Sequence, residues 1–250
     1  MTERTDRPEP YPPESSQEDK GGRWDEPHID SLPIRLINVF VSPGKLMDQL
    51  AAQPKWVGII LLTTIVSGVT AALVPADLIV ETVRRQMIAQ GLDVTEFGDA
   101  QMNALRYGRI PGAVIFALLL QFGIAALYAV IFSFVLGDDG RYGQYLAAVS
   151  HGWFIPVLFS VLLLPLMIRT ENLELRLTVD VFIASFFEPG LLRNVAKLLD
   201  LTVIWSILVI AQGAHAIDER RSFASAAVIM LTIFLLYALG VGLLQAGSIA

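Results

Sequence analysis

The sequence predicts an all-α polytopic membrane protein, a bundle of five transmembrane helices with short amphipathic interfacial helices. Two long apolar runs, residues 110–136 and 146–168, carry no formal charge and are joined by a short turn rich in Gly and Asp. About 20 apolar residues cross the hydrocarbon core of a bilayer as a helix, and both runs reach that length. Only 17% of the residues are charged, against about 25% in water-soluble domains.

Composition excludes several classes of function. The chain has no cysteine, so disulfides, thiolate nucleophiles and cysteine-based metal sites are ruled out. The net charge of −6 argues against nucleic acid as a partner, because that recognition needs clustered Lys and Arg. No Gly-rich phosphate loop, HExxH or Gly-x-Ser-x-Gly motif is present. The start of the chain shows no cleavable signal peptide, so the first span is expected to act as the insertion signal.

The chain divides into two parts at about residue 31. Residues 1–31 are polar and rich in Pro, and this composition predicts a disordered tail. Residues 32–250 form the predicted membrane domain. Near its start, Ser42-Pro43 has the chemistry of a helix N-terminus. The short helix that follows is expected either in the membrane interface or on the end of the bundle.

Five spans are expected, and each follows from an apolar run bounded by polar residues. The connection after the first span should begin with an amphipathic helix that ends at Gly91. Pro156 and Pro165 lie inside the third span, where each removes a backbone donor and is expected to kink the helix. The expected spans are residues 56–75, 110–136, 146–168, 191–217 and 223–246.

Four polar residues fall inside or at the ends of these spans: Gln121, His151, Asp200 and His215. Gln121 is expected to form a hydrogen bond with a neighbouring helix. Arg193 and Lys197 stand seven and three residues before Asp200, so on a continuous helix they would share a face with it. The carboxylate is therefore expected in an interfacial ion pair, with a proton or ion role as the alternative.

The two histidines are expected near one membrane face, since His151 follows one short turn and His215 precedes the other. A metal site there would need further ligands. The candidates are the acidic residues of the two turns, Asp138, Asp139, Asp218 and Glu219. The expected role of these groups is instead to hold helices together and anchor them at the interface, and the metal site is the alternative. No cofactor is expected.

The two short turns carry Arg141, Arg220 and Arg221. Positive residues in short loops favour the cytoplasmic side. The N-terminus is therefore expected in the cytoplasm and the C-terminus outside, in a bacterial inner membrane.

Several segments resemble Yip1-domain membrane proteins. They include the apolar-Pro segment 39–43, the turn leading into a Trp- and Pro-containing helix at 140–156, and residues 198–205, Leu-Leu-Asp-Leu-Thr-Val-Ile-Trp. The resemblance extends over roughly residues 32–244. The eukaryotic members carry an Asp-Leu-Tyr-Gly-Pro stretch before the spans and act with small GTPases in vesicle traffic. This chain has no such stretch, so it looks like the shorter prokaryotic branch. The resemblance implies no catalytic residues.

The function expected from these features is a non-catalytic membrane scaffold or adaptor that affects membrane organisation. Its expected partners are the lipid bilayer and a protein, or a second copy of the chain, bound through helix faces. The alternative is a small-solute or ion transporter, which would need a polar path at the bilayer midplane.

Overall fold

The computed structural model describes residues 29–89, 91, 99–186, 188 and 190–247. The regular secondary structure of this part of the chain is helical, and its only extended pairing is an isolated bridge between Thr178 and Asp200. The predicted tail, residues 1–31, falls almost entirely outside the described residues. The all-helical class is confirmed.

The chain begins with two short helices, α1 (Leu32–Val41) and α2 (Pro43–Ala52). As predicted, α2 starts directly after Ser42. Val39 of α1 and Leu46, Met47 and Leu50 of α2 are buried in one cluster with residues of α6, α7 and α10. Of the two expectations, packing on the bundle is therefore the one that the structure shows.

The first predicted span corresponds to α3 (Val57–Leu73), which is followed by α4 (Ala76–Ala89). Pro75 lies between them, and the two helix axes meet at 86°. Pro has no N–H and restricts the residue before it, so the helix stops there. Gly91, at φ +73°, follows α4, as the sequence predicted.

The second predicted span begins earlier than expected. Helix α5 runs over Asp99–Ala129 and continues into a π-helical segment, η1 (Val130–Val135). The prediction placed the start of this span at Ile110. The helix starts earlier, and Pro111 lies in its interior.

The third predicted span corresponds to two consecutive helices, α6 (Tyr142–Gly152) and α7 (Phe154–Arg169). Together they form one candidate span of 28 residues. The interruption is at Trp153, three residues before Pro156, whose ring leaves one helix carbonyl without its donor. Pro165 lies inside α7 without interrupting it.

The fourth predicted span, 191–217, is broken, which corrects the prediction. Helix α9 (Leu191–Leu198) ends before Asp200, and α10 (Leu201–Ile217) starts after it. Asp200 is the N-cap of α10, because its carboxylate accepts the Thr202 N–H at 2.8 Å. An acid that caps a new helix cannot also continue the old one. A four-residue helix, α8 (Asp180–Ile183), precedes α9.

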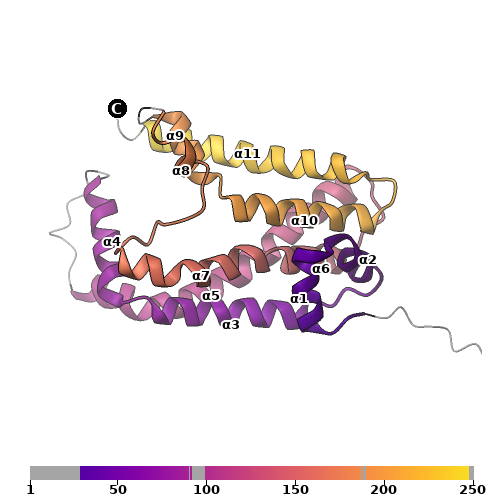
Figure 1. The fold of residues 1–250 in the computed structure, drawn as a ribbon, viewed down its shortest axis with the longest axis horizontal. Helices are drawn as coiled ribbons and strands as arrows, with labels where there is room; N and C mark the ends of the chain where they lie inside the picture. Colours follow the sequence, from indigo (N-terminus) through magenta and orange to yellow (C-terminus); the bar gives the residue numbers. More distant parts are fainter. Residues whose placement is uncertain (1–28, 90, 92–98, 187, 189, 248–250) are drawn as a thin grey trace, which may run out of the picture.

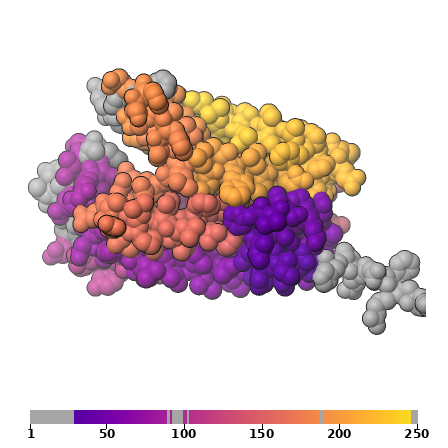
Figure 2. All heavy atoms as spheres, in the orientation of Figure 1, coloured from indigo at the N-terminus to yellow at the C-terminus, as the bar shows by residue number. Residues whose placement is uncertain are grey.

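The last predicted span corresponds to α11 (Phe223–Gly247). In Figure 1, α10 and α11 lie side by side over the layer of α3, α5 and α7, with α4 at the left and the turn between α10 and α11 at the right. The space-filling view shows these two layers separating toward the left, where α8 and α9 stand apart from α4 and α7 (Figure 2). The core cluster of α3, α5, η1, α6, α10 and α11 includes Phe132, Tyr145 and Met230.

Among the described residues, three helices are long and apolar enough to cross a membrane, and a fourth is counted if the bent pair α3–α4 is one span. The three are α5 with η1, α6 with α7, and α11. Helix α10 is also apolar but is shorter, with 17 residues. The three long helices expose large apolar side chains, such as Phe116 and Leu119 of α5. An exposed apolar surface of this kind suits contact with lipid.

Candidate functional site

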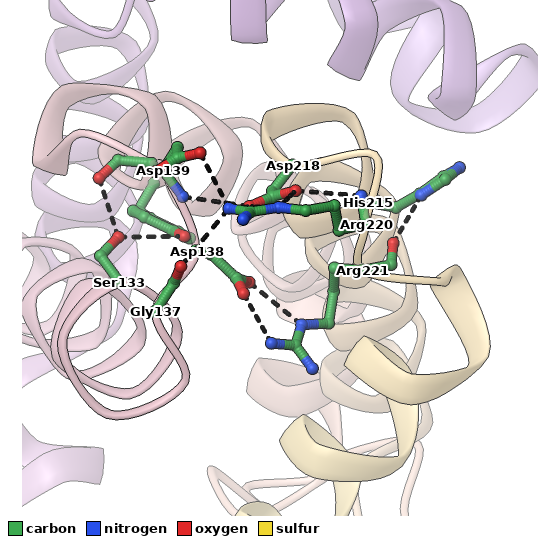
Figure 3. Close-up of polar contacts among 10 residues, drawn as sticks. Ser133, Gly137, Asp138, Asp139, His215, Asp218, Arg220 and Arg221 are labelled. Carbon is green, nitrogen blue, oxygen red and sulfur yellow. Dashed lines mark hydrogen bonds and ion pairs between the residues drawn. The ribbon is translucent and has the colours of Figure 1, made fainter.

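Two short turns at the right-hand end of the bundle are joined by a network of charges, which we call the turn latch: Asp138, Asp139, Asp218, Arg220 and Arg221 (Figure 3). Arg221 holds Asp138 with two hydrogen bonds, one of them at 3.0 Å from Nε. Arg220 bridges Asp218, at 3.0 Å from Nε, and Asp139, at 2.8 Å from Nη2. These contacts join Asp138 and Asp139 of the first turn to Arg220 and Arg221 of the second.

The backbone of the first turn positions these acids. Gly137, at φ +74°, takes the left-handed conformation that ends a helix at low cost. The Asp138 N–H then donates to the Phe132 carbonyl at 2.9 Å, across the π-helical turn. Ser133 donates to the Gly140 carbonyl at 2.8 Å (Figure 3). This backbone conformation directs Asp138 and Asp139 toward the turn between α10 and α11.

Each carboxylate of the latch is occupied by an arginine. The Arg220 side chain is the largest cause that holds the pKa of Asp218 well below its ordinary value, and the Asp139 N–H adds to it at 3.0 Å. In return, Asp218 raises the pKa of Arg220, and the hydrogen bond to Asp138 raises that of Arg221. Asp138 and Asp218 are buried to 8% and 7% exposure. Charge pairing makes that burial tolerable.

His215 belongs to this end of the molecule. Its Nδ1 donates to the Arg221 carbonyl at 2.6 Å, since a carbonyl can only accept (Figure 3). The candidate metal ligands Asp138, Asp139 and Asp218 are held by arginines instead. Within the described part of the chain, no three His, Asp or Glu side chains lie close enough to bind a metal ion.

His151 has different partners and is fully buried. Its Nε2 lies 3.1 Å from Nη1 of Arg35, and its Nδ1 lies 2.8 Å from the Ala147 carbonyl. Arginine can only donate, so Nε2 accepts and Nδ1 carries the hydrogen. His151 is thus a neutral acceptor that ties α1 to α6.

Gln121 connects two long helices, as the sequence predicted for it. Its side-chain amide donates to the Thr63 hydroxyl at 3.2 Å and to the Ala117 carbonyl at 3.1 Å. Gln121 and Thr63 are both fully buried. This contact joins α5 to α3 within the apolar part of the bundle.

The expected ion pair of Asp200 with Arg193 or Lys197 is not formed. Arg193 pairs instead with Asp180, at 3.0 Å. The hydrogen bond from Arg193 is the main cause that lowers the pKa of Asp180. The predicted pairing does not occur because the helix breaks between Arg193 and Asp200. The two residues therefore do not share a helix face. Asp200 satisfies the N–H and the hydroxyl of Thr202, at 2.8 and 2.7 Å.

Sequence reasoning gave no role to Arg35, Thr63 or Asp180. For the latch arginines a usable signal existed: Arg-Arg in one short turn and Asp-Asp in the other, with opposite charges at one end of the bundle. Arg35 gave no such signal, because a lone arginine in a short amphipathic segment is expected to face water.

The polar groups just described connect elements in pairs. The latch joins the α5–α6 turn to the α10–α11 turn, Arg35 joins α1 to α6, and Gln121 joins α3 to α5. Chemistry on a substrate needs a nucleophile or an acid–base pair in one place. The arrangement is that of structural connections between helices.

Comparison with curated proteins finds none that matches, and comparison with solved structures likewise finds none. A family model does match: that of the Yip1 domain, over residues 37–242. The match begins within α1 and ends within α11, and therefore includes the latch, His151 and Gln121. The chain belongs to the Yip1 domain family of membrane proteins.

Proposed function

We propose that this protein is a non-catalytic membrane scaffold or adaptor of the prokaryotic type, which binds protein partners or a second copy of itself. The observation that carries this proposal is the use of the buried polar side chains. Gln121 and His151 each have partners on a neighbouring helix, and Asp138 is held by Arg221. Groups spent on holding helices together are not available for a reaction.

We further propose five crossings, formed by α3, α5 with η1, α6 with α7, α10 and α11. Helices of 17 residues, such as α3 and α10, are about 25 Å long at 1.5 Å per residue. The hydrocarbon core is about 30 Å thick, and a shorter helix is accommodated by local thinning at modest cost. The arrangement in Figure 1 supports an odd number of crossings, since α1 and the end of α11 lie at opposite ends.

The orientation that we propose places the latch end, with Arg141, Arg220 and Arg221, on the cytoplasmic side of a bacterial inner membrane. Positive residues in short turns favour that side. The N-terminus would then be cytoplasmic, and the connections 74–98 and 170–190 would face the other compartment.

Site-specific photo-crosslinking in cells tests the adaptor role. A photoreactive residue replaces Arg84 or Gln86 on α4, or Glu171 on the connection after α7, all of which are exposed. A reproducible protein adduct from one of these positions is expected, with Val69 on the apolar face of α3 as the control site, where lipid adducts should dominate. No protein adduct from any polar position would contradict the proposal.

A parallel flux measurement in proteoliposomes separates an adaptor from a transporter. Gln121→Ala, His151→Ala and Asp200→Ala are each expected to leave solute flux at the background of empty vesicles, as the unaltered protein does. A flux that the unaltered protein supports and all three variants lose would contradict the adaptor role.

A further inference from the structure

Arg35 is a buried cation without an acidic partner among the described residues. Its exposed fraction is 7%. Nη1 donates to the Lys55 carbonyl at 2.9 Å and to Nε2 of His151 at 3.1 Å. Both acceptors are neutral. Every other buried charge described above, in Asp138 and Asp218, faces an arginine.

The guanidinium group also has unused donors. Its Nε is sealed from the surface and has no hydrogen-bond partner. Nη2 also has no hydrogen-bond partner among the described residues, but unlike Nε it is not sealed from the surface. Burial lowers the pKa of Arg35. A buried, unpaired charge is costly in a folded protein.

The acid nearest to Arg35 along α1 is already engaged. Asp30 accepts hydrogen bonds from Asn38 at 3.1 Å and Gln49 at 3.0 Å, and it lies 4.0 Å from the Lys45 ammonium. Its role is to join α1 to α2. It is therefore not the counter-ion of Arg35.

The surroundings of Arg35 support contact with a lipid headgroup. The opposite face of α1 is apolar and exposed: Ile34, Ile37 and Val41 are 47%, 60% and 76% exposed. The contact with Lys55 places the guanidinium at the start of α3, beside Trp56, a residue type that prefers the headgroup level. Acyl chains on the outer face of α1 would bring their phosphates to this level.

We propose that Arg35 binds a phosphate group, supplied by an anionic phospholipid headgroup lodged at the junction of α1 with the start of α3. An N–H of a guanidinium group suits a phosphate oxygen, because the hydrogen bond is assisted by charge. His151 and the Lys55 carbonyl hold the guanidinium group through Nη1, and Nη2, which is not sealed from the surface, is the donor left for a phosphate oxygen. The inference depends on membrane embedding and not on the adaptor role.

The test measures the thermal unfolding of the full-length protein in detergent after addition of dioleoyl phosphatidylglycerol. A ligand that binds only the folded state raises the midpoint of unfolding. Phosphatidylglycerol is expected to raise it by several degrees. Dioleoylglycerol, which has the same chains without phosphate, and inorganic phosphate, which has no chains, are expected to produce no comparable rise.

Substitutions assign the effect to the site. Arg35→Gln is expected to reduce the shift from phosphatidylglycerol to that from dioleoylglycerol. Arg35→Lys, which keeps the charge but lacks the guanidinium group, is expected to retain part of the shift and serves if the first variant does not fold. Arg106→Gln is the matched control, because Arg106 forms an exposed pair with Asp77, and it should keep the full shift.

Three outcomes would overturn the proposal. One is an equal lipid shift in Arg35→Gln and the unaltered protein. Another is an equal shift from inorganic phosphate, which would identify a free anion as the ligand. A third is a much larger lipid shift when Asp25 and Glu26, the acids that precede Asp30 in the sequence, become Asn and Gln, because these acids would then have occupied Arg35 in the unaltered protein.

Discussion

The turn latch and the Arg35–His151 contact bury charge in opposite ways. In the latch, arginines and aspartates from two distant turns neutralise one another, and Asp138 and Asp218 keep only 8% and 7% exposure. At Arg35, an equally buried cation meets two neutral acceptors. The latch is complete within the chain, whereas the other contact leaves donors for something outside it.

A third kind of charge contact lies at the other end of the bundle. Arg106 and Asp77, which join α5 to α4, have side chains 47% and 86% exposed. Exposed pairs contribute little to stability because water screens them and long side chains lose entropy. The comparison shows that an ion pair stabilises its end of the bundle according to how deeply it is buried. The number of ion pairs at each end matters less.

The largest expected effect comes from breaking the latch with Arg221→Ala. Asp138, whose side chain is 5% exposed, would be left buried without its partner. The loss in the free energy of unfolding should be about 3 kcal/mol, at the low end for a broken buried pair because the Arg221 side chain is partly exposed. SDS titration in mixed micelles measures it.

The matched control for this prediction is Arg106→Ala, which should cost less than about 0.5 kcal/mol. A second control is Arg221→Gln combined with Asp138→Asn, which should recover much of the loss. Equal losses in Arg221→Ala and Arg106→Ala would show that burial does not distinguish the two ends.

The next effect concerns the packing of α6 against α10, beside His151. A Cβ on Gly152 would lie 2.6 Å from the Ile210 side chain and 3.2 Å from the Ser206 carbonyl. Gly152→Ala is therefore expected to destabilise by about 1–3 kcal/mol, as overpacking does. Gly240→Ala is the control, since no atom lies within 4 Å of its Cβ position, and it should be neutral or stabilising in the same titration.

A smaller effect is expected from Asp200→Ala, which removes the N-cap of α10. Loss of a cap costs about 1 kcal/mol, and Asp200→Asn should retain most of the stability because it can still accept the Thr202 N–H. Thermal unfolding of the three proteins in detergent checks the order. If Asp200→Asn lost as much as Asp200→Ala, the negative charge and not the cap would be the important feature.

Replacing Gln121 by Leu should have a similar or smaller effect. Hydrogen bonds between membrane helices are worth about 0.6 kcal/mol on average, and Leu replaces the lost volume. A double-mutant cycle with Thr63→Val isolates the pair. A coupling energy near zero would mean that the 3.2 Å contact adds nothing to helix association.

The smallest effect is the response of the latch to acid. The folded-state pKa of Asp218 is lowered, mainly by Arg220. A lowered pKa stabilises the fold above the unfolded value, about 3.9 for Asp, and this contribution is lost as the pH falls through the folded value. The melting temperature of Asp218→Asn should therefore approach that of the unaltered protein only below about pH 4, and a constant gap across that range would contradict the assignment.

The sequence predicted much of the helical framework and little of its polar detail. The start of α2 after Ser42 and the end of α4 before Gly91 followed from local chemistry, and the meeting of the two charged turns followed from helix order. The break at Asp200 was missed because Asp200 lies within an apolar run long enough for one helix. Nothing in that run showed that Asp200 would act as an N-cap. The burial of Arg35 was missed because it depends on His151 and Lys55, which are distant in sequence.

The central claim is that the bundle spans a bilayer with the latch at one face and α4 at the other. The absence of cysteine in the chain allows single cysteines to be labelled with a membrane-impermeant maleimide in oriented vesicles. Glu219→Cys in the latch turn and Arg84→Cys on α4 are the positions to compare. The account predicts that they react from opposite sides of the membrane, and labelling of both from the same side would contradict it.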